Sequence, residues 1–110
     1  MRPPVPTHIR KVLKIFKKEL IRIYGDRLDQ VVLYGSRARG DARDDSDIDV
    51  LIVLKAKFNY SEMLELSSDF AASLSLDNDV VISRAFVSKA DYENRQVPFL
   101  MNVRREGVQV

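Results

Sequence analysis

Asp47 and Asp49 are the residues whose type and spacing point most directly to chemistry, because one residue separates them at the start of an apolar run. Alternate residues of a strand point to the same face of a sheet, so this spacing places both carboxylates side by side. At about 4 Å and an effective dielectric near 20 their repulsion is about 4 kcal/mol, and a bound cation removes it. Hard oxygen ligands at this spacing suit Mg²⁺ or Mn²⁺. The alternative is that these acids belong to a solvated turn.

Gly35 and Ser36 form a second pair, directly after the apolar run 31–34. A glycine at this point lets backbone N–H groups approach a phosphate closely, and the serine adds a hydroxyl. A helix that begins here also favours an anion. Arg37 and Arg39 are nearby cations that suit phosphate charge. An ordinary strand-to-helix turn is the alternative interpretation.

The composition excludes several other kinds of site. The chain has no Cys and a single His, His8, which excludes cysteine-based metal sites and a multi-histidine site. No apolar run reaches the ~20 residues that cross a bilayer, and the first residues lack the apolar segment of a secretory signal. We therefore expect a cytoplasmic protein without a membrane partner. Its 110 residues are expected to form one domain over residues 1–110.

The charge is distributed unevenly along the chain. Residues 1–24 carry seven Lys or Arg side chains against one acid, a charge of +6, whereas the remainder carries −4. This stretch is either a solvated helix face or a docking surface for an acidic partner or nucleic acid. Aromatic residues are not interleaved with these cations as in proteins that bind single strands, so direct nucleic-acid binding is not expected.

Hydrophobic periodicity and capping signals predict the elements that must position these residues. Thr7 is expected to cap the first helix and Gly25 to end it, and Asn59 with Glu62 forms a capping box for the second long helix. The alternation of helices and strands predicts an α/β (α+β) domain with a small sheet flanked by helices. The predicted helices cover residues 8–24, 59–76, a short segment from Ser88, and 98–106, and the predicted strands cover 31–34, 48–54 and 79–83.

The chain carries, in order, a predicted strand, Gly35-Ser36, ten residues, Asp47-x-Asp49 and another predicted strand. This order resembles the nucleotidyltransferase superfamily typified by DNA polymerase β. Three segments resemble its minimal branch: Tyr-Gly-Ser-Arg-Ala-Arg-Gly at 34–40, Asp-Asp-Ser-Asp-Ile-Asp at 44–49 and Pro-Phe-Leu-x-Asn-Val-x-Arg-Glu-Gly at 98–107. The resemblance covers about residues 30–110. It implies the palm-like fold of polymerase β, with a small mixed sheet.

The resemblance also implies a third carboxylate on a neighbouring strand. Asp79 is the expected residue, since on a strand its side chain would share a face with Val81, and Asp77 is the alternative. The resemblance assigns two Mg²⁺ ions to Asp47 and Asp49, with Asp79 binding one ion and accepting a proton from the acceptor hydroxyl. It assigns the nucleotide phosphates to Gly35 and Ser36, and phosphate charge to Arg37 and Arg39.

By the same resemblance, the expected activity is transfer of AMP from ATP to a hydroxyl, with release of pyrophosphate. The expected acceptor is a Tyr of a HEPN-domain partner, an RNase toxin that this modification (AMPylation) neutralises, so this chain would be the antitoxin. Two alternatives stay open: a nucleotidyltransferase acting on a small molecule, and a module that neutralises a toxin by contact alone.

Overall fold

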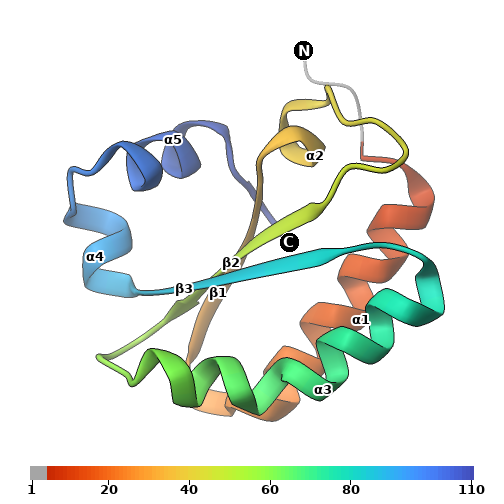
Figure 1. Ribbon diagram of the computed structural model, residues 1–110. Coiled ribbons are helices and arrows are strands. Elements are labelled where there is room, and N and C mark those ends of the chain that lie inside the picture. The colour runs from red at the N-terminus through yellow and green to blue at the C-terminus, as the bar shows by residue number, and fades with distance from the viewer. Residues whose placement is uncertain (1–4) are drawn as a thin grey trace.

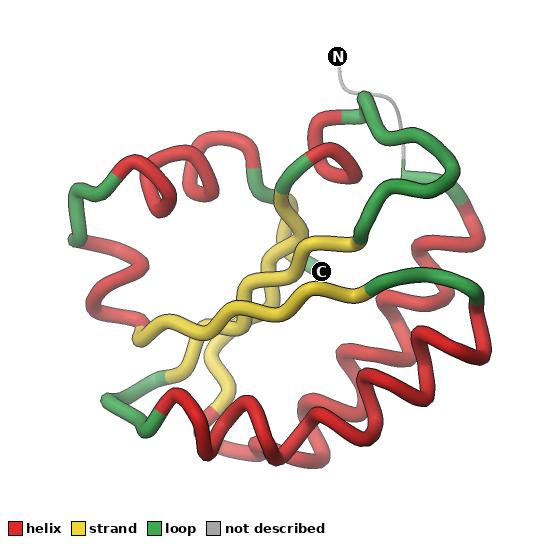
Figure 2. The backbone as a smooth tube through the Cα atoms, viewed as in Figure 1, coloured by secondary structure: helices red, strands yellow, loops and turns green. Residues whose placement is uncertain are grey.

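The computed structural model of the protein describes residues 5–110. Helices and strands alternate along the chain, and four strands join into one sheet of order β3-β2-β1-β4 (Figures 1 and 2). The elements are α1 (Thr7–Tyr24), the short 3-10 helix η1 (Gly25–Arg27), β1 (Leu28–Tyr34), α2 (Ser36–Arg39), β2 (Ile48–Leu54), α3 (Tyr60–Asn78), β3 (Ile82–Ser88), α4 (Lys89–Asn94), α5 (Pro98–Glu106) and β4 (Val108–Gln109).

The sheet is mixed, as predicted. β1 pairs antiparallel with β2 on one side and with β4 on the other, while β3 pairs parallel with β2. At one end of the sheet Tyr34 lies opposite Asp49, and Asp49 lies beside Ser83 of β3. Paired residues in adjacent strands point to the same face, so these three side chains share one side of the sheet.

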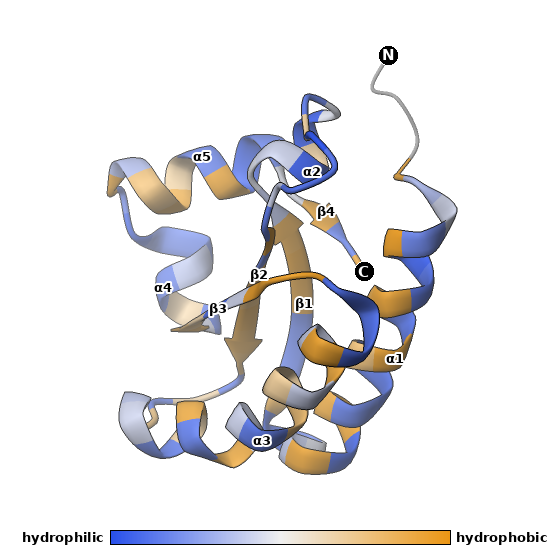
Figure 3. Ribbon diagram, turned by 45° about the vertical axis from the view of Figure 1, so that its right-hand side comes forward, coloured by the Kyte–Doolittle hydropathy of each residue, from blue (hydrophilic) through white to orange (hydrophobic). Residues whose placement is uncertain are grey.

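Helices cover both faces of the sheet (Figure 3). Ile48, Val50 and Ile52 are fully buried on the face that packs against α1 and α3. Leu51 and Val53 are fully buried on the other face, in a smaller cluster with Leu100 and Val103 of α5. Asp49 belongs to the second face, because it shares the parity of Leu51. The strand is therefore apolar on both faces except at the end that carries Asp49.

The first helix is amphipathic, as predicted. Most of its apolar residues are buried in the core with residues of the sheet and α3, while Ile15 and Ile21 are half exposed. Hydrophilic and hydrophobic positions alternate along the helix (Figure 3). Arg10, Lys14, Lys17 and Lys18 line a groove of about 580 Å³ together with β4 residues. The expected cap at Thr7 is wrong: Thr7 is already helical, Pro6 precedes it, and no side chain caps this end. Gly25 ends the helix with a φ of 54°, as expected.

The second long helix is longer than predicted, and the strand after it begins later. The Asn59 side chain accepts a hydrogen bond from the Glu62 N–H at 2.9 Å, which confirms the predicted cap. α3 continues to Asn78, and Asp79 ends it in the left-handed region with a φ of 53°. The predicted strand over 79–83 is therefore wrong, since β3 begins only at Ile82.

The remaining elements agree with the sequence-based expectations in part: β1 begins at Leu28, three residues before the predicted start of that strand. β2 and α5 have the predicted bounds, and the Ser88 side chain caps α4 by accepting from the Asp91 N–H. The two-residue strand β4, which pairs with Val32 and Leu33, was not expected. Over residues 5–110, every helix is too short or too polar to span a membrane.

Candidate active site

The end of β1 and the beginning of β2 bring the two sequence pairs together. Tyr34 is the last residue of β1, Gly35 follows with a φ of 72° and a ψ of −155°, and α2 begins at Ser36. A Cβ atom on Gly35 would overlap Oδ2 of Asp49. Glycine is therefore needed here for two reasons: it lets the turn lie directly against the carboxylate, and it adopts a positive φ freely.

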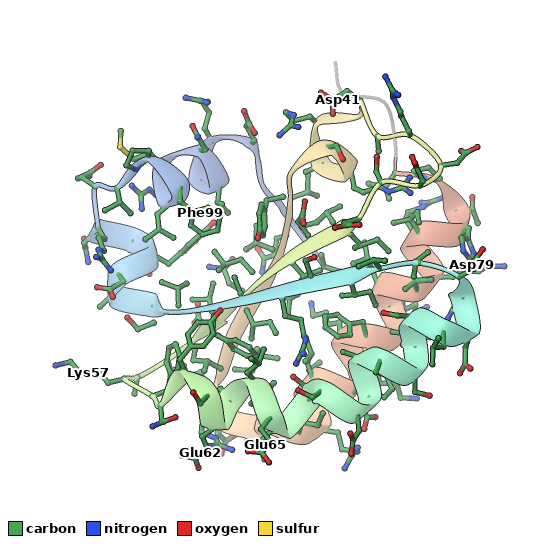
Figure 4. All side chains as sticks on the ribbon, in the orientation of Figure 1. Asp41, Lys57, Glu62, Glu65, Asp79 and Phe99 are labelled. Atoms are coloured by element: carbon green, nitrogen blue, oxygen red, sulfur yellow. The ribbon has the colours of Figure 1, made fainter. Side chains whose placement is uncertain are left out.

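A pocket of about 460 Å³ opens over this turn. One side of the pocket comes from the β1–α2 turn and β2, and the other side comes from α5. The lining residues are Tyr34, Gly35, Ser36, Arg39, Asp49, Phe99, Asn102, Val103 and Glu106. Figure 4 shows Phe99 on α5, across the sheet from α3.

The contribution of α5 to this pocket was missed from the sequence. Phe99, Asn102 and Glu106 are spaced by three and four residues, so they lie on one face of the helix. That spacing, with an exposed aromatic and two polar side chains beside the buried Leu100 and Val103, was the available signal. The spacing does not show which element this face of α5 contacts, because the contact depends on how α5 packs on the sheet.

The two carboxylates are close enough to influence each other. Asp47 is exposed, whereas Asp49 is half-buried. Burial raises the pKa of Asp49, the charge of Asp47 raises it further, and Arg39 opposes both effects. This is the expected electrostatic behaviour of two neighbouring acids, here Asp49 on β2 and Asp47 at the end of the loop before it.

The expected position of Asp79 beside these carboxylates is wrong. Asp79 is exposed at the C-terminal end of α3 and, with Asp44 and Asp45, lines a separate hollow of about 620 Å³ (Figure 4). Within residues 5–110 no group of three His, Cys, Asp or Glu side chains is placed to hold a metal ion. Asp77 is also exposed, within α3.

The physical reason lies in how α3 ends. The Asp79 N–H donates to the carbonyls of Leu76 and Ser75, which satisfies the end of the helix. Asp tolerates the left-handed conformation that this ending needs. The parallel register then begins at Ile82, opposite Ile48, and places Ser83 beside Asp49.

The two arginines have different surroundings. Arg37 is buried and donates from Nη2 to the carbonyls of Asp44 and Ser46, at 3.3 and 3.2 Å. It therefore holds the acidic loop and does not line the pocket. Arg39 does line it, and forms ion pairs with Asp41 at 3.2 Å and with Glu106 at 3.4 Å.

Two aromatic side chains also line the pocket. The rings of Tyr34 and Phe99 meet edge to face, with centroids 5.3 Å apart. Burial raises the pKa of the Tyr34 hydroxyl, and the nearby charge of Asp49 adds to this. Tyr34 therefore stays protonated well above neutral pH.

This arrangement defines a class of site. Paired carboxylates beside a glycine-serine turn, with a cation in the same pocket, suit a polyphosphate and a divalent ion. They lie in a mixed sheet with helices on both faces, the fold that the sequence resemblance to nucleotidyltransferases implies.

Comparison with known proteins gives the family. The model of the family described as polymerase beta, nucleotidyltransferase matches residues 11–106. The chain belongs to this family, as the sequence resemblance implied. It is 36% identical over 102 residues to a Methanocaldococcus jannaschii protein provisionally named a protein adenylyltransferase, covering 93% of this chain and 98% of that protein. It is 32% identical over 80 residues to the protein adenylyltransferase MntA of Thermococcus cleftensis, covering 73% and 79%.

Solved structures share the fold. A Sulfolobus solfataricus protein provisionally described as a nucleotidyltransferase superposes with a TM-score of 0.67 at 25% identity, covering 93% of this chain and 80% of that chain. A complex of a tri-AMPylated HEPN toxin with an MNT antitoxin from Shewanella oneidensis superposes with a TM-score of 0.50 at 19% identity, covering 94% and 71%.

Proposed function

We propose that this protein transfers AMP from ATP to a tyrosine hydroxyl of a HEPN-domain partner. The observation that carries the proposal is the pocket in which Asp49, the Gly35-Ser36 turn and Arg39 meet. The names of the M. jannaschii and T. cleftensis relatives support transfer of an adenylyl group to a protein. The Shewanella complex supports a HEPN toxin as the acceptor.

The donor set fits a divalent ion. Asp49 supplies carboxylate oxygens from β2, and Asp47 supplies them from the end of the loop directly before that strand. Their mutual repulsion is the kind that a cation relieves. Mg²⁺ is commonly bound by one or two carboxylates together with substrate phosphates, so Mg²⁺ or Mn²⁺ would be held by these residues. Such an ion supplies positive charge to the phosphate oxygens. With Asp79 at the end of α3, Asp47 and Asp49 are the protein ligands that we propose.

The remaining residues hold and orient the nucleotide. The Gly35-Ser36 turn presents backbone N–H groups and a hydroxyl to the β- and γ-phosphates, and Arg39 adds positive charge. Arg37 fixes the loop that leads to Asp47. The acceptor oxygen attacks the α-phosphorus, and the bond between the α-phosphorus and the oxygen that bridges to the β-phosphorus breaks. Pyrophosphate leaves with the electron pair of that bond, and the hydroxyl proton passes to solvent.

The acceptor surface is proposed to come from another polypeptide. Residues 1–110 are proposed to form a single domain, and every lining residue of the pocket belongs to the nucleotidyltransferase fold itself. A partner that supplies the tyrosine would complete the site. A small-molecule acceptor would need an element that binds it, and we find none among the described residues. An antitoxin that acts by contact alone is distinguished from a catalytic one by the experiment below.

The test is to incubate the protein with ATP, Mg²⁺ and a HEPN-domain protein, and to read AMP addition by intact-mass spectrometry. Asp47→Asn is expected to lower the transfer rate at least about a hundredfold, because it removes a proposed metal ligand. Asp45→Asn is the matched control, since Asp45 lies in the same loop but lines the separate hollow. Full toxin inhibition without modification would instead establish the contact-only antitoxin.

A further inference from the structure

The α5 wall of the pocket is not used by the chemistry above. Phe99 is 45% exposed although it is a large apolar side chain, and its ring contacts Tyr34 at the rim of the pocket. Val103, on the same helix, is buried beneath it. An aromatic ring that packs against a second ring and is still 45% exposed beside a polar pocket is a surface on which a flat ligand can stack.

The pocket is polar at one end and aromatic at the other. Glu106, at the end of α5, pairs with Arg39 near the phosphate-binding turn. Phe99 lies seven residues earlier, which along a helix is roughly 10 Å. With the triphosphate held at the Gly35-Ser36 turn and Arg39, the nucleoside of a bound nucleotide extends toward Phe99. Asn102 lies one turn from Phe99 on the same helix face, between the two ends.

We propose that α5 binds the nucleoside, with Phe99 stacking on the base and Asn102 hydrogen-bonding to it. This inference rests on the proposed nucleotide-binding function and adds the residues that hold the base. Stacking is tolerant of base identity because every base has a π-face. Asn102 adds a donor and an acceptor, which read the edge of a base as Asn does with adenine. Affinity therefore comes from Phe99, and preference among bases from Asn102.

The test measures binding of two ligands by calorimetry, MgATP and Mg-tripolyphosphate, the second of which has no base. Phe99→Ala is expected to weaken MgATP binding about five- to a hundredfold and to leave tripolyphosphate binding within about twofold. Phe99→Tyr restores MgATP binding because it retains the ring. Asn102→Ala is expected to change the ratio of MgATP to MgGTP affinity without changing tripolyphosphate binding.

Met101→Ala is the matched control, because Met101 is 47% exposed on the same helix and does not line the pocket. Unchanged MgATP affinity in Phe99→Ala would overturn the stacking role and leave the proposed function intact. An equal loss for both ligands would show that Phe99 acts only through the shape of the pocket, and would also overturn it. A parent protein that binds neither ligand would reject the proposed function itself.

Discussion

At Gly35 the absence of a Cβ atom allows the Gly35-Ser36 turn to lie directly against the Asp49 carboxylate. The overlap between a Cβ atom at this position and Asp49 Oδ2 means that any other side chain must displace the carboxylate. Gly25 has a similar backbone, with a φ of 54°, but a Cβ atom there would meet nothing within 4 Å. Comparing substitutions at the two glycines therefore distinguishes the free-energy cost of the backbone conformation from the effect of displacing the Asp49 carboxylate.

Gly35→Ala is expected to lower both stability and MgATP affinity, whereas Gly25→Ala lowers stability alone. Each substitution forces an alanine into a sparsely populated backbone region, which costs roughly 1–3 kcal/mol. Only the change at residue 35 also moves Asp49. Melting curves and MgATP calorimetry on both variants measure the two effects. Equal MgATP affinity in both variants would contradict the contact between Gly35 and Asp49.

Asp49→Asn is expected to stabilise the metal-free protein at neutral pH, by up to about 1 kcal/mol after solvent screening. Burial and Asp47 raise the pKa of Asp49, so the folded state disfavours its charged form. The stability that the protonated carboxyl provides is present below the unfolded pKa of about 3.9 and is lost as pH rises through the folded pKa. The advantage of Asn should therefore disappear toward pH 3.

Unfolding curves in EDTA at pH 3 to 7 measure this dependence. In Mg²⁺ and ATP the rise in Tm should be smaller for Asp49→Asn than for the parent, because ligand binding stabilises the folded state by mass action. A variant that is clearly less stable in EDTA and keeps the full Mg²⁺–ATP shift would show that Asp49 is a structural residue.

At the scale of elements, Tyr24 and Arg84 join three elements through one serine. The Tyr24 hydroxyl lies 2.5 Å from the Met63 carbonyl and 2.9 Å from Ser67 Oγ, and Arg84 Nη1 donates to Ser67 Oγ at 2.6 Å. Ser67 is fully buried. This network connects α1, α3 and β3 on the side of the sheet opposite the pocket, so it supports the strands without contacting the site.

Tyr24→Phe is expected to lower the free energy of unfolding by about 0.5–1.5 kcal/mol, because it removes a buried hydroxyl that forms two hydrogen bonds. Tyr60→Phe is the control: Tyr60 also packs on Phe86, but it is 47% exposed, and no hydrogen bond of its hydroxyl occurs among the described residues. Denaturant unfolding compares the two variants. A Tyr24→Phe variant as stable as Tyr60→Phe would contradict the network's contribution.

The elements that could be predicted are those with local signals. The bounds of β2 and α5 follow from an apolar run and from Pro98 and Gly107, which act within a few residues. The start of β3 could not be predicted in this way. Val80 and Val81 have the β-branched side chains of a strand, but the pairing of Ile82 with Ile48 is a tertiary contact that determines where the strand begins.

At the scale of the whole molecule, local sequence signals predict some residues of the site, whereas tertiary contacts determine the others. The proximity of Gly35, Ser36 and Asp49 could be predicted from the sequence, since they lie at facing ends of the consecutive strands β1 and β2. Asp47 ends the loop before β2 and is not among the residues that line this pocket. Asp79 was misplaced for the reason just given. The α5 wall could not be predicted, because its place in the pocket depends on how a distant helix packs over Leu51 and Val53.

The pairing of Tyr34 with Asp49 also bears on the order in which the chain folds. Residues 35–48 form the connection that must close to bring the Gly35-Ser36 turn to Asp49, and closing a short loop costs little chain entropy. The α5 wall joins from some fifty residues further along the chain, after β3 has added to the sheet. We therefore expect the part of the pocket proposed to hold phosphate to form early in folding and the part proposed to hold the base to form last. A chain in which α5 has transiently detached would keep the first part and lose the second.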